Sequence, residues 1–387
     1  MTFPLLFARN LFLPEDLGGN RYPYETIRRL GARGHPVTVV TPGLHHAWPE
    51  LPNVRYHLYP VLRPHPVVSH ASNLLAGFAA LRRERGYSVA IAGSYEAGLA
   101  IGWWRLAPLV FLFHSEFYSE WVARQRPLRR AIRAYMVAVE RRVFEYSRRI
   151  VAVSQFSARQ IVSRLPSASS KIRVVPTGVD TVFFSPPASP PAERSALRRE
   201  LGFSVHEPLL VGVGRLAGVK QFDRLVTGFA VAAARGLGGR LVIAGDGPER
   251  PRLERLVATY GLADRVCLAG YCDPLRLRAL MQAADLQVCS SAFENLSLAI
   301  LEGMACGTPV LGTPGGGTPE LVGAIDAGLV LADDEPHTLA EALPSLLSDP
   351  DRLVELGHRA RALAVERYDW ERVVDGLEAV MREAIQG

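Results

Sequence analysis

The chain has 387 residues, of which 48% are hydrophobic and 21% are charged. This length accommodates two domains of ordinary size, and the composition excludes a disordered or collagen-like chain. The four cysteines include no C-x-x-C pair, which argues against a disulfide framework and against a cysteine-ligated zinc site. The N-terminal segment lacks a basic stretch followed by a long apolar run, so we expect no signal peptide and a cytoplasmic location.

Positive charge is concentrated in the first half of the chain. Residues 1–182 hold 24 Lys and Arg against 11 Asp and Glu, whereas the remainder holds 20 against 27. The segment 124–149 contains nine arginines and two glutamates, and its apolar residues recur at helical spacing. Such a helix fits an anionic surface at the inner face of a membrane or an acidic partner, and it also fits the solvated face of a core helix.

The chain begins with a β-α-β pattern. An apolar strand at 3–8 is followed by a loop with Gly18 and Gly19, a helix over 24–30 and a strand at 37–40. This alternation predicts the start of a doubly wound parallel sheet. The paired glycines permit positive φ and a close backbone approach to a ligand, and a plain turn would use them as well.

A histidine follows a buried strand later in the first half. The predicted strand 109–113 ends at His114, and Glu116 lies two residues further on. Ligands usually bind at the carboxyl ends of parallel strands, so His114 is a candidate ligand-binding residue as well as a candidate structural one. The proline-rich segment 185–193 predicts a linker.

The second half opens with a glycine-rich strand at 209–215. Gly212, Gly214 and Gly218 follow the spacing G-x-G-x3-G, which differs from the G-x-G-x-x-G spacing of dinucleotide-binding proteins. Lys220 comes next, and it is one of only two lysines in a chain with 42 arginines. A compact ammonium at this position suits the oxygen of a phosphate group.

An apolar helix with a carboxylate inside it is predicted at 295–305. An ionised Glu302 in that helix costs several kcal/mol unless it is hydrogen-bonded. Glu294 precedes the helix, and a continuous helix would separate the two glutamates by about 12 Å. This exceeds the roughly 5–9.5 Å of a glycosidase acid/base pair. It suits a ligand held at both ends with its anionic groups near the helix start, although the residues alone leave Glu302 open as a core carboxylate satisfied by the protein.

Three motifs resemble those of the nucleotide-sugar-dependent glycosyltransferases of family 4. Residues 290–321 resemble the family's E-x7-E donor motif with its small-residue strand, residues 214–221 resemble G-R-x-x-x-x-K-G, and residues 174–180 resemble V-x-P-N-G-V-D. Three departures stand out. Gln221 replaces the final glycine of the second motif, Thr177 replaces the asparagine of the third, and Asn-Leu-Ser follows Glu294 where the family usually has Gly/Ser-Phe-Gly.

The resemblance implies an α/β protein with the GT-B fold, in which two Rossmann-like, doubly wound parallel-sheet domains flank an interdomain cleft. It places an acceptor-binding domain at 1–182, a linker at 183–207 and a donor-binding domain at 208–367. A C-terminal helix at 368–387 is expected to cross back onto the first domain. The implied reaction is retaining, metal-independent transfer of a hexose-type sugar from a UDP- or GDP-linked donor to a hydroxyl of a glycan, a glycolipid or a small molecule, without a cofactor.

The resemblance also assigns site residues. Catalytic roles fall to His114, Arg215, Lys220 and Glu294. The donor site comprises Gly18, Gly19, Gly214, Arg215, Lys220, Gly247, Tyr271, Glu294, Asn295, Leu296, Ser297, Leu298 and Glu302. The acceptor site comprises Gly19, His114 and Glu116. In the family the lysine and arginine hold the donor diphosphate, the first glutamate holds the sugar hydroxyls and the second holds the ribose. No metal site is expected.

Two rival hypotheses remain at this point. An epimerase or hydrolase on the same fold would consume the nucleotide sugar without an acceptor. A polyanion- or membrane-binding protein would use the basic first half, with affinity that falls steeply with salt; it leaves Glu302 unexplained, and we expect no nucleic acid partner. The donor base, the sugar, the acceptor, the linkage and the oligomeric state stay open.

Overall fold

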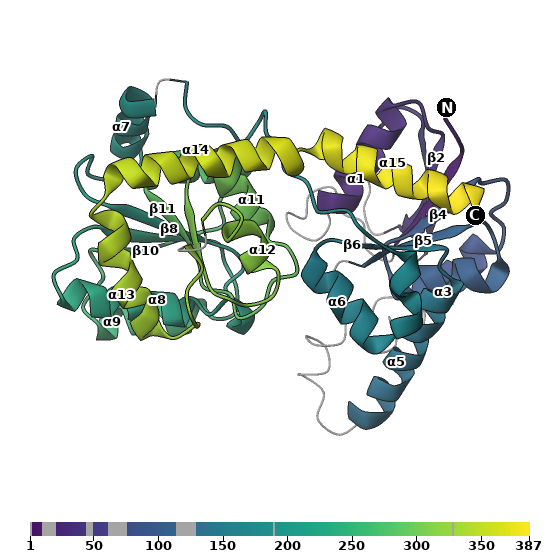
Figure 1. Cartoon of the computed structure of the whole chain (residues 1–387), viewed down its shortest axis with the longest axis horizontal. Helices are drawn as coiled ribbons and strands as arrows, with labels where there is room; N and C mark the ends of the chain where they lie inside the picture. Colours follow the sequence, from purple (N-terminus) through teal and green to yellow (C-terminus); the bar gives the residue numbers. More distant parts are fainter. Residues whose placement is uncertain are drawn as a thin grey trace. The chain divides into compact units, whose positions relative to one another are not determined.

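The chain folds into two compact units in a computed structural model that describes residues 2–9, 21–43, 49–60, 76–113, 129–188, 190–326 and 329–387. Unit 1 comprises Met1–Thr177 and Trp370–Gly387, and unit 2 comprises Gly178–Asp369 (Figure 1). Each unit has its own sheet and its own hydrophobic core.

Unit 1 contains a parallel sheet of seven strands. They are β1 (Leu5–Ala8), β2 (Val37–Pro42), β3 (Val54–Tyr59), β4 (Val89–Ala92), β5 (Leu109–Phe113), β6 (Arg149–Ala152) and β7 (Ile172–Val174). Their order in the sheet is β3-β2-β1-β4-β5-β6-β7, and every pairing is parallel. Apart from β3 and β7 at the two edges, these strands are almost entirely buried, as expected when helices cover both faces.

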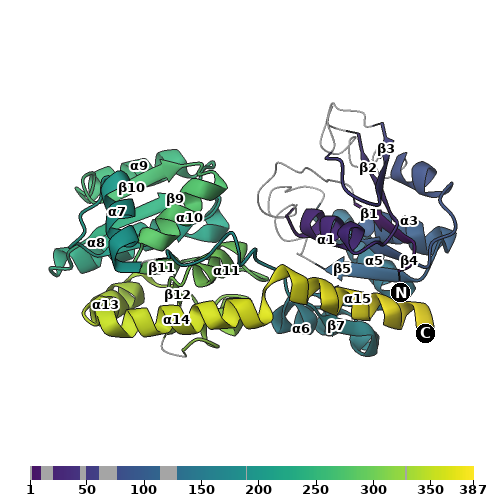
Figure 2. The same ribbon diagram turned by 90° about the horizontal axis from the view of Figure 1, so that it is seen from above.

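Helices cover both faces of this sheet. They are α1 (Arg21–Ala32), α3 (Tyr95–Trp104), α5 (Arg129–Tyr146), α6 (Gln155–Arg164) and α15 (Trp370–Gln386), together with the 3-10 turn η1 (Pro166–Lys171). Because strand side chains alternate, Leu5 and Phe7 pack with α1 and α15 on one face, while Leu6 and Ala8 pack with α3, α5 and α6 on the other. Figures 1 and 2 show α15 lying across the strands of unit 1.

Unit 2 contains a parallel sheet of five strands. They are β8 (Leu209–Val213), β9 (Arg240–Ala244), β10 (Val266–Gly270), β11 (Leu286–Cys289) and β12 (Val310–Gly312), in the order β10-β9-β8-β11-β12. The helical elements are α7 (Pro190–Glu200), η2 (Gly218–Lys220), α8 (Phe222–Ala234), α9 (Arg250–Thr259), α10 (Pro274–Ala283), α11 (Leu298–Ala305), α12 (Thr318–Val322), α13 (Pro336–Leu347) and α14 (Pro350–Arg367). In Figure 2, α13 and α14 lie side by side in this unit.

Both sheets have the doubly wound strand order, which confirms the predicted fold class of two Rossmann-like units. In each, the first strand lies in the middle, the next strands are added on one side and the later ones on the other. The direction reverses between β1 and β4 in unit 1 and between β8 and β11 in unit 2. Ligands of such sheets bind outside the carboxyl ends of the strands at this reversal.

Two element boundaries differ from the sequence prediction. Within the predicted linker 183–207, Pro190–Glu200 forms helix α7, because proline lacks only an N–H that the first helical turn leaves unbonded. The helix predicted at 295–305 begins at Leu298, so a continuous helix does not connect Glu294 to Glu302. In the part of the chain that the structure describes, no helix combines the length and apolarity needed to cross a bilayer.

Candidate functional site

Two loops meet at the carboxyl ends of β8 and β11 in unit 2. The loop after β8 reaches Lys220 through η2, and the loop after β11 runs from Ser290 to α11. The hydroxyl of Ser290 donates a hydrogen bond to the carbonyl of Lys220 (2.8 Å), and the N–H of Ala292 donates one to the carbonyl of Val219 (2.9 Å). The strand order therefore brings together two motifs that lie about 70 residues apart in the sequence.

Lys220 and Glu294 form an ion pair across these loops. The ammonium of Lys220 contacts Oε1 of Glu294, and the hydroxyl of Ser291 donates a hydrogen bond to the same oxygen at 2.9 Å. The side chains are 22% and 13% exposed, so the pair is largely shielded but still reachable. A cation and a hydrogen-bond acceptor are thus held next to each other at the sheet's ligand-binding edge.

A glycine turn packs closely against the residues before α11. The N–H of Gly317 donates a hydrogen bond of 2.6 Å to the carbonyl of Glu294. A Cβ added to Gly316 would lie 2.1 Å from that carbonyl oxygen, and a Cβ on Gly315 would lie 2.2 Å from the carbonyl oxygen of Ala292. Gly316 also has a φ of +69°, so this approach requires glycine.

Two glycines close the loops on the β8–β9 side of the site. A Cβ on Gly245 would lie 1.9 Å from the carbonyl oxygen of Gly214, and a Cβ on Gly247 would lie 2.5 Å from that of Leu216. The predicted donor residues Gly214 and Gly247 therefore serve close backbone packing beside Arg215. The exposed guanidinium of Arg215 has no ion pair or hydrogen bond to any residue described by the structure.

Glu302 lies in α11, whose other side chains fill the core of unit 2. Ile300, Leu301 and Met304 are fully buried, and Glu302 itself is 6% exposed. Ser297, which precedes the helix, makes no side-chain cap hydrogen bond. The first N–H groups of α11 are therefore not satisfied by that hydroxyl, which leaves a partial positive charge at the helix start.

The remaining predicted residues fall into two groups. Asn295 and Ser297 are buried beside Glu294, and Tyr271 follows β10 with 65% of its surface exposed. Leu296 packs against the core of unit 2, and Leu298 is the first residue of α11. The predicted residues of unit 1 lie outside the described residues, and these are Gly18, Gly19, His114 and Glu116.

Comparison with known proteins identifies the family. The family model "Glycosyl transferases group 1" matches residues 193–363, and "Glycosyltransferase Family 4" matches residues 18–183. The D-inositol 3-phosphate glycosyltransferase of Acidothermus cellulolyticus is 32% identical over 403 residues, covering 96% of this chain and 86% of that protein. The chain belongs to the family 4 glycosyltransferases. Against the D-inositol 3-phosphate glycosyltransferases of Segniliparus rotundus and Nocardia farcinica, the match spans about half of the relative's length, at 53%.

Solved structures share the fold of this glycosyltransferase. Sucrose-phosphate synthase from Thermosynechococcus elongatus superposes with a TM-score of 0.82 at 24% identity, covering 99% of both chains. HepE of Anabaena, solved in complex with UDP-glucose, superposes with a TM-score of 0.75 at 19% identity, covering 98% of this chain and 99% of that one. The predicted GT-B fold is confirmed.

Sequence reasoning missed two side chains in the candidate site of unit 2. Ser291 orients the Glu294 carboxylate, and Ser290 anchors the Lys220 carbonyl. A signal for them was present, because both follow directly after β11 at the reversal of strand order. Cys289 ends that strand, and burial raises the pKa of its thiol, which disfavours the thiolate that a cysteine nucleophile needs.

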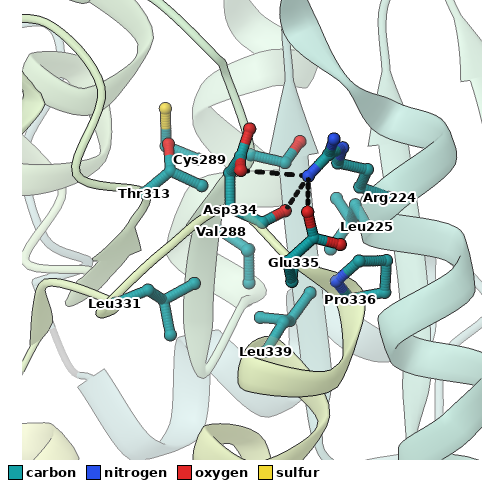
Figure 3. A pocket seen from close by; sticks show the side chains of 11 residues that line it. Arg224, Leu225, Val288, Cys289, Thr313, Leu331, Asp334, Glu335, Pro336 and Leu339 are labelled. Atoms are coloured by element: carbon teal, nitrogen blue, oxygen red, sulfur yellow. Dashed lines mark hydrogen bonds and ion pairs between the residues drawn. The ribbon is translucent and has the colours of Figure 1, made fainter.

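A small pocket lies behind this site, between α8 and the start of α13 (Figure 3). Arg224, Cys289, Thr313, Leu331 and Leu339 are among the residues that line it. Its volume of about 10 Å³ is room for one water molecule and excludes a nucleotide. The pocket therefore belongs to the support of the site and does not hold a substrate.

Proposed function

We propose that the protein transfers a hexose-type sugar from a nucleoside-diphosphate sugar to an acceptor hydroxyl, with retention of configuration and without a metal ion. The observation that carries this proposal is the Lys220–Glu294 pair at the strand reversal of unit 2. Lys220 supplies a cation for the diphosphate. Glu294, in direct contact with Lys220, supplies a carboxylate that accepts hydrogen bonds from sugar hydroxyls.

Each proposed role follows from the chemistry of the group. Lys220, the exposed Arg215 and the start of α11 stabilise the charge that develops on the departing diphosphate. Glu294 accepts hydrogen bonds from hydroxyls of the transferred sugar, and the buried Glu302 accepts them from the ribose. When the donor binds, Lys220 and Glu294 contact the donor instead of each other.

The groups that react at the transferred carbon belong to the two substrates, and no protein side chain serves as nucleophile or base. We propose that the acceptor hydroxyl attacks on the face that the diphosphate leaves and gives its proton to a phosphate oxygen. His114 and Glu116, with Gly18 and Gly19, are proposed to position the sugar and the acceptor. An epimerase or hydrolase is distinguished from this by consumption of donor when no acceptor is added.

The proposed donor is a UDP-hexose, with a GDP-hexose as the second choice. HepE of Anabaena binds UDP-glucose and has the same fold. The proposed acceptor is a phosphorylated small molecule, because two relatives aligned over 96% of the chain are D-inositol 3-phosphate glycosyltransferases. A screen of acceptors should also include glycans and lipid-linked saccharides.

The first test is thermal stabilisation by UDP, GDP, ADP, dTDP and their sugars, measured without metal. A ligand at 100 times its dissociation constant raises the free energy of unfolding by about 2.7 kcal/mol. The stabilisation should disappear in Lys220→Ala and persist in Lys171→Ala, which alters the chain's other lysine, in unit 1. Stabilisation that survives Lys220→Ala, or the absence of any stabilisation, contradicts the donor site.

We also propose that the protein is cytoplasmic and peripheral at the inner membrane face through residues 124–149. The described part of this segment, α5, exposes Tyr135 and Val137 beside Arg141 and Arg142. Apolar and basic groups together favour binding to anionic lipid. Liposome co-sedimentation checks this: retention by anionic but not by zwitterionic vesicles supports it, and no retention by either contradicts it.

A further inference from the structure

Gln221, the residue after Lys220, has an unusual backbone conformation. Its φ of +48° and ψ of +39° lie in the left-handed region, which is unfavourable for residues that have a Cβ. In the part of the chain that is described, only Asn53 and Arg105 share this property among the non-glycine residues. The motif that this segment resembles has glycine here, so a glutamine at this position carries a cost that glycine would avoid.

The side chain of Gln221 connects to the start of α13. Its Nε2 donates a hydrogen bond of 3.0 Å to Oδ2 of Asp334, 113 residues away in the sequence. Arg224 holds the same aspartate, with Nη1 at 3.0 Å from Oδ1 and at 2.9 Å from the carbonyl oxygen, and it also pairs with Glu335 at 3.0 Å. Figure 3 shows Arg224 reaching Asp334 and Glu335 at the rim of the pocket.

The amide of Gln221 is committed to this one contact. Its Oε1 is buried and makes no hydrogen bond to any residue that the structure describes. A buried, unsatisfied carbonyl adds a second cost to the strained backbone. A residue that brings two such costs at the edge of a ligand site indicates a role that glycine would not fulfil.

These contacts fix the turn that carries Lys220 from two sides. On the β11 side the hydroxyl of Ser290 holds the Lys220 carbonyl at 2.8 Å, and on the α13 side Asp334 holds the Gln221 amide. A lysine ammonium sits on a flexible four-carbon stem, so its position depends on how firmly its backbone is held. Both contacts therefore hold the backbone at Lys220 or directly beside it, and Lys220 is the residue that pairs with Glu294.

We propose that Gln221 is a positioning residue for Lys220: through Asp334 it fixes the turn and so sets the affinity for the diphosphate part of the donor. The inference rests on the proposed donor site. It extends that site to a polar network on α8 and α13 that does not itself touch the ligand.

The test combines Gln221→Gly with a double-mutant cycle. Glycine keeps the left-handed backbone and removes the amide, so the melting temperature should stay the same or rise. Affinity for the nucleoside diphosphate selected by the thermal panel, measured by calorimetry, should fall about fivefold to tenfold, a size typical of residues coupled in one network. Affinity for the corresponding monophosphate should fall far less, because the monophosphate lacks the second phosphate that Lys220 holds. In a Lys220→Arg background, which keeps a cation and measurable binding, Gln221→Gly should have a smaller effect than in the unaltered protein.

Asp334→Asn provides the matched variant on the other side of the contact, since it removes the charge and preserves the size. It should reproduce the selective loss of diphosphate affinity. Equal losses for monophosphate and diphosphate, additive effects in the double variant, or unchanged affinity in Gln221→Gly overturn the inference. If the unaltered protein binds no nucleoside diphosphate, the proposed function itself fails, which is a different outcome.

Discussion

At the scale of single residues, the substitution Glu302→Gln tests whether the buried carboxylate binds the donor. Gln has nearly the same shape as Glu, so Glu302→Gln should leave the packing of α11 intact and the free energy of unfolding unchanged or slightly higher. Loss of a charged hydrogen-bond acceptor should weaken donor binding about 10- to 100-fold. Calorimetric titration with circular dichroism as a fold check measures both, and Glu366→Gln, 72% exposed on α14, is the control.

Glu140 on α5 gives a pH dependence. Burial raises its pKa from 4.5 to about 7, against the hydrogen bond from the Tyr95 hydroxyl, at 3.3 Å. The folded protein therefore keeps this proton up to about pH 7, whereas the unfolded chain releases it near pH 4.5. The stability that the group contributes is complete below pH 4.5 and is lost as the pH rises through 7. The Arg164 guanidinium, at 3.0 Å from the Glu140 carboxylate, favours its ionised form and reduces this loss.

Urea unfolding of the unaltered protein and of Glu140→Gln between pH 4.5 and 8 measures this contribution as a difference. The unaltered protein should lose stability relative to the variant over that range. A difference that is constant with pH would show that the ion pair with Arg164 balances the burial, and a gain of stability with rising pH would show that it outweighs the burial.

Residue-level features differ in how far the sequence reveals them. Lys220 stands out because lysine is rare in the chain, and Glu294 stands out because it precedes an apolar helix. The contact between Gln221 and Asp334 cannot be read from the sequence, because it joins positions 113 residues apart through the packing of α8 on α13. Periodicity and motif spacing carry no information about such a pairing.

At the scale of elements, the glycine turn before α12 should be intolerant of a Cβ. Gly316→Ala would place Cβ 2.1 Å from the Glu294 carbonyl oxygen and impose an alanine on a φ of +69°. We expect a loss of about 1–3 kcal/mol in the free energy of unfolding and weaker donor binding, since Glu294 moves with the turn. Gly238→Ala, with no atom within 4 Å of the new Cβ, is the control for unit 2.

The C-terminal helix α15 packs on unit 1 through several buried apolar side chains, of which Trp370 is the largest. Trp370 is fully buried, its ring lies 5.5 Å from that of Tyr22, and the Arg29 guanidinium lies 5.6 Å from its centre. Trp370→Ala should cost about 3–5 kcal/mol, measured by urea unfolding. Glu371→Gln, which breaks ion pairs to Arg29 and Arg33 at a 60% exposed position, should cost at most about 1 kcal/mol.

The element boundaries show where local sequence signals are ambiguous. Apolar content predicts a helix from residue 295, but Asn295–Ser297 instead turn the chain so that Glu294 meets Lys220. Prolines at 186–191 predict a linker, and two of them begin α7, whose Leu197 packs against the cluster that includes strand residues Leu209 and Val242. In both cases tertiary contacts decide between conformations that the local residues allow equally.

At the scale of the whole molecule, the alternation of strands and helices was sufficient to predict two doubly wound sheets, because parallel strands need crossover helices and these crossovers are right-handed. The alternation of strands and helices does not reveal which unit the C-terminal helix joins. Trp370–Gly387 joins unit 1 although it follows unit 2 in the sequence. Its apolar residues pack in the core of unit 1, with Trp370 against Tyr22, and Glu371 and Glu378 pair with Arg33 of α1.

The separate cores predict the unfolding behaviour of the full chain. The buried clusters of unit 1 and unit 2 share no residue, and the chain passes from one unit to the other twice, after Thr177 and after Asp369. We therefore expect differential scanning calorimetry to show two transitions. A nucleoside diphosphate at 100 times its dissociation constant should raise only the transition of unit 2, by the equivalent of about 2.7 kcal/mol. Trp370→Ala should lower only the other transition, which assigns the two. A single transition that moves as a whole with either change would mean that the two units unfold as one cooperative structure, and that the nucleotide stabilises both.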